Sequence, residues 1–191
     1  MNRRELLKLI SAATGSVVIG GEFFLSGCKS NDAVSGNYFT EKDIAFFDEV
    51  TETIIPKTNT PGAKEAAVGQ FMATYSTDCY SEEQRKILKE GITKLNEASE
   101  KMNKSSFLKA TAEQKQSLLI DIDKEAKKYI ADNTAKGVAE WPPHYFTLMK
   151  QLILFGFFTS KPGVTQVLRY MPVPGKYEGC IDYKEGETSW A

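Results

Sequence analysis

Few side chains in this sequence can serve as a nucleophile, a general base or a soft metal ligand, and they lie far apart along the chain. The 191 residues contain one histidine, His144, and three cysteines, Cys28, Cys79 and Cys180. A zinc, haem or iron–sulfur site needs several such ligands, so the composition argues against a metal site built by this chain alone. His144 follows Pro143 at an expected helix start, where capping or packing is a commoner role than catalysis. We expect no catalytic, cofactor or metal site in this chain.

Cys79 and Cys180 are the two thiols outside the N-terminal segment. In an exported protein they predict a disulfide. It would close a loop of about 100 residues and stabilise the fold by roughly 4–5 kcal/mol in the chain-entropy model. Two separate thiols, buried or paired with another chain, fit the sequence equally well.

The N-terminal segment has the layout of an export signal. A basic head is followed by an apolar stretch from Leu9 to Ile19, which is shorter than the roughly 20 residues of a membrane-spanning helix. The segment ends at Leu25-Ser26-Gly27-Cys28, which resembles a lipobox, in which the cysteine is lipidated and becomes the mature N-terminus. The alternative is an ordinary secretory signal with an incidental cysteine.

The basic head resembles the twin-arginine motif, which directs the export of proteins that are already folded. Arg3 and Arg4 are followed by Leu6, Leu7 and Lys8. The alternative is a generic positively charged signal head. We expect an export signal at residues 1–27, a flexible polar tether at 28–38 and one domain at 39–191.

The composition is that of a globular domain with almost no net charge. Hydrophobic residues make up 41% and charged residues 26%, and Lys+Arg 24 against Asp+Glu 25 leaves a net charge of −1. No basic field is available for a phosphate backbone, so we expect no nucleic-acid partner. The length corresponds to a single domain.

Hydrophobic spacing predicts about five helices and no strands, which is an all-α fold. Thr40, Ser81 and Thr111 each stand where an N-cap is expected, and apolar residues recur at helical spacing after them. Another helix is expected to start at Pro61-Gly62-Ala63, with an inner face made by Ala67, Phe71 and Tyr75.

The last predicted helix begins near Pro142-Pro143 and ends at Lys161-Pro162-Gly163. Its apolar run at residues 152–158 predicts a central core helix. The following tail, residues 171–191, is rich in proline, glycine and aromatic residues, which prevents regular structure while favouring burial of the rings. These rings cover either the chain's own helices or a partner.

Two motifs occur in order across the expected domain. The first is residues 55–63, with Ala66-Ala67-Val68 and Phe71 after it. The second comprises residues 157–163, 168–170 and 173–180, and Trp190-Ala191 closes the chain. Together they resemble the signatures of the gluconate 2-dehydrogenase subunit 3 family.

This resemblance implies a small non-catalytic subunit of an oxidoreductase complex. Family members escort a large flavoprotein of the glucose-methanol-choline type, which holds FAD and lacks its own export signal. That subunit oxidises sugars, sugar acids or glycosides, and electrons pass to a cytochrome c subunit with haem c or to another membrane-linked acceptor. A lipidated Cys28 would also anchor the complex to the membrane on the periplasmic side. The alternative function is a stand-alone envelope lipoprotein that acts as a binding or scaffold module.

The partner surface is expected on one loop and on the C-terminal tail. Each aromatic ring can bury about 150–250 Å² against another protein, and prolines reduce the entropy lost on docking. The expected interface residues are Thr60, Pro61, Gly62, Tyr170, Pro174, Gly175, Tyr177 and Trp190.

Overall fold

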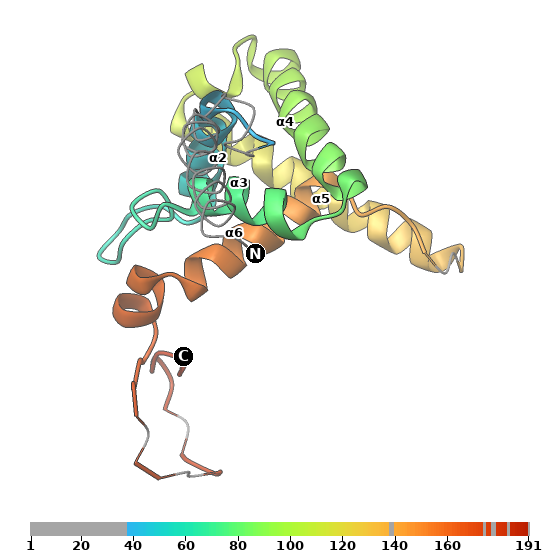
Figure 1. Cartoon of the computed structure of the whole chain (residues 1–191). Helices are drawn as coiled ribbons and strands as arrows, with labels where there is room; N and C mark the ends of the chain where they lie inside the picture. Colours follow the sequence, from blue (N-terminus) through green and yellow to red (C-terminus); the bar gives the residue numbers. More distant parts are fainter. Residues whose placement is uncertain (1–37, 138–139, 174, 177–178, 183, 191) are drawn as a thin grey trace, which may run out of the picture. The chain divides into compact units, whose positions relative to one another are not determined.

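Five α-helices form most of the chain that the structure describes, as the hydrophobic spacing predicts. This computed structural model describes residues 38–137, 140–173, 175–176, 179–182 and 184–190. The helices are α2 (Glu41–Ile54), α3 (Val68–Cys79), α4 (Glu82–Asn103), α5 (Ala112–Ala135) and α6 (Tyr145–Thr159) (Figure 1). Two short turns are η1 (Phe107–Lys109), a 3-10 turn, and η2 (Gly163–Val167), a π-helical turn. No strand occurs in these ranges, and the all-α prediction is confirmed.

Three helices begin at the N-caps that the sequence predicts. Before α2, the Thr40 N–H donates to Asp43 Oδ2 at 2.7 Å, and the Asp43 N–H donates to Thr40 Oγ1 at 3.4 Å. Ser81 and Thr111 form the same reciprocal pair with the third residue of α4 and of α5. Each cap contributes about 1 kcal/mol by satisfying backbone donors that a helix start leaves free.

The predicted start of α3 is wrong. Backbone turns continue from Ala63 to Ala67, and the helix begins at Val68 after Ala67 adopts a left-handed conformation with φ 53°. The predicted inner face holds only in part: Ala67 is exposed and Phe71 is half-buried, whereas the partly buried Tyr75 packs against the core. Contacts with α2 and α6 bury a neighbouring stripe instead, made by Val68, Gly69, Met72, Ala73 and Ser76.

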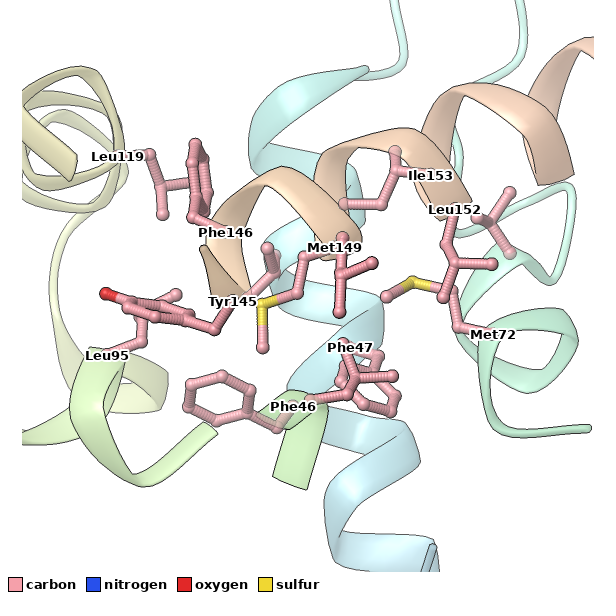
Figure 2. Close-up of a cluster of buried hydrophobic side chains, with 14 of the residues drawn as sticks. Phe46, Phe47, Met72, Leu95, Leu119, Tyr145, Phe146, Met149, Leu152 and Ile153 are labelled. Carbon is pink, nitrogen blue, oxygen red and sulfur yellow. The ribbon is translucent and has the colours of Figure 1, made fainter. Parts of the chain in front are cut away.

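The centre of the core is α6, which packs against α3, α4 and α5, while α2 packs against α3 and α5. Figure 2 shows Phe146, Met149 and Leu152 of α6 among side chains of the surrounding helices. Burial of each such side chain stabilises the fold by about 1.5–3 kcal/mol. The prediction of a central core helix holds for one side of α6 only. The exposed side of the run carries Leu154, Phe155 and Phe158, which are between 40% and 46% exposed.

The tail beyond η2 is irregular, as the sequence predicts. Its described residues contain neither helix nor strand, apart from one isolated bridge between Arg169 and Trp190. Among the helices in the described ranges, none is long and apolar enough to cross a membrane.

Candidate functional site

The loop between α2 and α3 folds around the carboxylate of Glu52, a residue of α2. Its Oε1 accepts the Lys57 N–H at 2.9 Å, and its Oε2 accepts the Lys64 N–H at 3.1 Å. Gly62 lies against the same carboxylate: a Cβ there would meet Glu52 Oε2 at 2.6 Å and Lys57 N at 2.7 Å. The glycine is therefore required for close approach, and the loop is a built structure held by α2.

Two further acidic residues of α2 extend this support. Glu49 pairs with Lys64 and Lys115, each at 2.8 Å. Hydrogen bonds from Lys115 and then Lys64 lower the pKa of Glu49. Burial raises the pKa of Asp48, although it accepts the Gly69 N–H. One side of α2 thus fixes both ends of the loop and the start of α3.

The first expected interface segment lies inside this loop. Pro61 and Gly62 are buried by the chain's own residues, and Thr60 is half-buried. The exposed part of the loop runs from residue 56 to 59. A direct role of Thr60, Pro61 and Gly62 in binding a partner stays a prediction, and the structure gives them a clear role in shaping the loop.

An aromatic cluster on α3 and α6 is a surface that the sequence analysis missed. The Phe155 ring lies 5.6 Å from Phe71 and 5.4 Å from Tyr75, centroid to centroid, and Phe71 stacks on Tyr75 at 5.4 Å. Gly156 allows the two helices to approach, because a Cβ there would overlap the Phe71 ring. The sequence did contain a sign of this cluster. The apolar run at residues 152–158 is continuous, whereas a helix with one buried side alternates apolar and polar residues.

A cleft of about 360 Å³ lies between α2, α5 and α6, with an apolar wall that includes Leu119 and Phe146. Its lysines are paired with carboxylates. Lys150 and Lys127 contact Asp123 at 2.6 Å and 2.7 Å, and their hydrogen bonds lower the pKa of Asp123. The residues that line this cleft include neither histidine nor cysteine. The polar part of its lining consists of paired lysines and Asp123 together with Thr53 and Gln116.

His144 serves as the N-cap of α6, and its predicted capping role is confirmed. Its Nδ1 accepts the Phe146 N–H at 3.3 Å, and the ring packs 4.5 Å from that of Tyr145. Burial lowers the pKa of His144, while Glu125 acts in the opposite direction. Burial also raises the pKa of Tyr145 to about 12.

The two cysteines are not joined in the structure. Cys79 is the last residue of α3 and Cys180 lies in the C-terminal tail, and both thiols are free and exposed. The disulfide between them is not formed in this structure, and neither thiol is buried. Pairing of Cys79 and Cys180 with each other or with another chain stays a prediction. Within the ranges that the structure covers, no three His, Cys, Asp or Glu side chains gather as a metal site.

The tail residues expected at the interface are exposed where they are described. Tyr170, Gly175 and Trp190 all face solvent. Pro174 and Tyr177 lie outside the described residues, as do the predicted export arginines Arg3 and Arg4, the lipidation site Cys28 and nearly all of the tether. An interface role for the tail stays a prediction.

Comparison with known proteins gives one match, on the family level. A search of the curated proteins found no match to this chain, and neither did a search of the solved structures. A family model described as gluconate 2-dehydrogenase subunit 3 matches residues 41–175. The match spans all five helices, the first motif and the second motif as far as residue 175. This chain therefore belongs to the gluconate 2-dehydrogenase subunit 3 family.

Proposed function

We propose that this protein is a non-catalytic small subunit that escorts and anchors an FAD-dependent dehydrogenase of the glucose-methanol-choline type. The family match over residues 41–175 carries the proposal, because the family is named as one subunit of a larger enzyme. In this proposal the large subunit binds FAD and oxidises a sugar, a sugar acid or a glycoside. Electrons then pass to a cytochrome c, through haem c, or to another membrane acceptor.

Exposed apolar side chains support a role in assembly. Leu154, Phe155 and Phe158 form the open side of a helix whose other side is the centre of the core. Water contact with such side chains is unfavourable, and patches of this kind are typical of surfaces that another protein covers. The single histidine is engaged in capping α6, which agrees with a subunit that binds rather than reacts.

The proposed location is the periplasmic side of a membrane. Only the sequence supports this location. Arg3 and Arg4 resemble the motif that directs export of folded proteins, and Cys28 resembles the lipidated cysteine of a lipoprotein. Two acyl chains would hold the protein firmly, since each buried CH₂ contributes about 0.8 kcal/mol.

Purification of the tagged protein from detergent-solubilised membranes tests this function. We expect a flavoprotein to co-elute in a fixed ratio, with bound FAD detected by its absorbance and with dye-linked oxidation of sugars or sugar acids. The same tag on an unrelated lipoprotein serves as the control. Recovery of this chain alone, with no flavin and no such activity, would contradict the proposal and favour a stand-alone envelope lipoprotein.

A further inference from the structure

Arg169 closes the C-terminal tail into a loop. Its N–H donates to the Ser189 carbonyl oxygen at 2.8 Å, and its guanidinium lies 3.1 Å from the Glu187 carboxylate. The same guanidinium sits over the Trp190 ring, 4.6 Å from the centroid. Three different interactions therefore join Arg169 to residues 187–190 at the end of the tail. Figure 1 shows the C-terminal end returning to the segment after η2. We call Arg169 with Glu187, Ser189 and Trp190 the Arg169 clamp.

The loop that this clamp closes, residues 169–190, displays apolar side chains to solvent. Every residue described from 170 to 190 is exposed. Five of them are large and apolar, and Val173 reaches 81% exposure: the set is Tyr170, Met171, Val173, Ile181 and Trp190. Long irregular loops in compact domains are usually either functional or flexible linkers, and the Arg169 clamp distinguishes this loop from a linker. Apolar residues that a loop holds in water are the pattern expected of anchors for another protein.

The charges on the loop indicate which kind of surface it fits. An anionic lipid surface attracts segments with an excess of lysine and arginine. This loop has no such excess in its sequence, since Arg169, Lys176 and Lys184 are balanced by Glu178, Asp182, Glu185 and Glu187. Mixed charges around apolar anchors are typical of a protein–protein interface with a polar rim.

We propose that the loop at residues 169–190 is the docking element for the catalytic dehydrogenase subunit, and that Arg169 is the positioning residue that orders it beforehand. This inference rests on the proposed function for the identity of the partner. A closed loop loses less conformational freedom on binding than an open tail of the same length. Trp190, which the sequence predicts as an interface anchor, has another role in this proposal. Its ring lies under the Arg169 guanidinium and closes the loop.

Two methionines provide a matched test of the docking surface. Met171 in the loop and Met102 at the end of α4 are both 48% exposed. Affinity is measured as the Kd between the full-length chain and the purified flavoprotein that co-elutes with it. We expect Met171→Asp to raise Kd by about tenfold or more, and Met102→Asp to leave Kd within about twofold. Both variants should keep the melting temperature of the wild type, because both side chains are exposed.

Arg169 is tested by a readout that needs no partner. In the free chain, Arg169→Ala should speed tryptic cleavage after Lys176 and Lys184 severalfold and raise Kd for the flavoprotein about tenfold. Arg169→Lys keeps the charge but loses the planar guanidinium. Its cleavage rate and its Kd should lie between those of the wild type and those of Arg169→Ala. Faster cleavage with unchanged Kd would show that ordering of the loop does not serve docking, and would overturn the role of Arg169.

The remaining outcomes separate this inference from the proposed function. Wild-type Kd in both methionine variants would overturn the docking surface while leaving the subunit role intact. Vesicle binding is measured on protein without acyl chains on Cys28. A Met171→Asp variant of it that loses binding to phosphatidylethanolamine–phosphatidylglycerol vesicles, and not to the flavoprotein, would assign the loop to the membrane and overturn the inference. If no flavoprotein binds the wild-type chain, the proposed function fails and this inference fails with it.

Discussion

Glu52 is the residue on which the shape of the α2–α3 loop depends, because its two carboxylate oxygens take backbone N–H groups from both sides of the loop. We expect Glu52→Ala to lower the free energy of unfolding by about 1 kcal/mol. Glu52 is only half-buried, so water can replace part of the hydrogen bonding that the carboxylate provides. Urea denaturation measures the change. Glu97→Ala, at an exposed position of α4, is the control and should change stability by less than about 0.5 kcal/mol.

Gly62 gives an independent check of the same contact. A methyl group there would overlap both the Glu52 carboxylate and the Lys57 backbone nitrogen. Gly62→Ala should therefore distort the loop and lower the free energy of unfolding. If Glu52→Ala and Gly62→Ala both unfold at the wild-type urea concentration, the loop is not held in this way.

Acid should destabilise the protein in two stages. The pKa of His144 is lowered by burial from its usual 6.5, so as the pH falls below about 6.5 the unfolded chain takes up a proton before the folded one does. The pKa values of Glu49 and Asp123 are lowered by hydrogen bonds from lysines. Their contribution is present above the usual carboxyl range, near 4, and is lost as the pH falls through it.

The melting temperature measured between pH 8 and pH 3 tests this pH dependence. We expect a shallow decline below about pH 6.5 and a steep one below about pH 4.5. His144→Asn keeps a hydrogen-bond acceptor at the N-cap, because the amide oxygen of Asn takes the place of the ring Nδ1. Asn suits this position well but cannot titrate. It should therefore remove the shallow stage only. A shallow stage that survives in His144→Asn would show that another group causes it.

At the scale of the elements, the approach of α6 to α3 depends on Gly156. Alanine normally stabilises an exposed helix position by about 1 kcal/mol relative to glycine. Here the added methyl would overlap the Phe71 ring, and overpacking of this kind costs about 1–3 kcal/mol. We therefore expect Gly156→Ala to lower stability rather than raise it, as measured by urea denaturation.

Gly175→Ala is the control for that substitution, because a Cβ at Gly175 would meet nothing within 4 Å. Its stability should equal that of the wild type. A stabilised Gly156→Ala variant would mean that the Phe71 ring moves away without loss and that the close approach is not needed.

The parts of the fold that follow local rules could be predicted from the sequence. The caps at Thr40, Ser81 and Thr111 are local, because each involves residues three positions apart. The start of α3 could not be predicted in this way. Pro61 and Gly62 have the local character of a helix start, but the loop is shaped by Glu52 from the preceding helix.

The same difference between local features and contacts of distant residues applies to the candidate surfaces. Proline, glycine and aromatic residues identified an irregular tail, because composition alone shows that it cannot continue a helix. The Arg169 clamp joins residues about twenty positions apart, and no spacing rule reports such a contact. The aromatic cluster around Phe155 was missed because a continuous apolar run does not show which of its sides the core covers.

At the scale of the whole molecule, the proposed role combines anchoring with escort. In this proposal, anchoring depends on lipidation of Cys28. We expect Cys28→Ala to release the protein from membranes or leave an uncleaved form, because the proposed acyl chains on the mature N-terminus would be lost. Fractionation and the intact mass of the N-terminus measure this. Unchanged membrane retention, with no lipid mass on wild-type protein, would contradict the anchor. Ser26→Ala, which leaves a small residue before the cysteine, is the matched control.

Escort is the central claim, and the location of the flavoprotein partner tests it most directly. In this proposal, the export signal with Arg3 and Arg4 belongs to this chain, and the partner is exported without a signal of its own. When both are replaced by lysine, we expect flavin-containing dehydrogenase and this protein to remain together in the cytoplasm, as measured by activity and immunoblotting of cell fractions. Normal export of the flavoprotein in that double variant would contradict the account, wherever this chain itself is found.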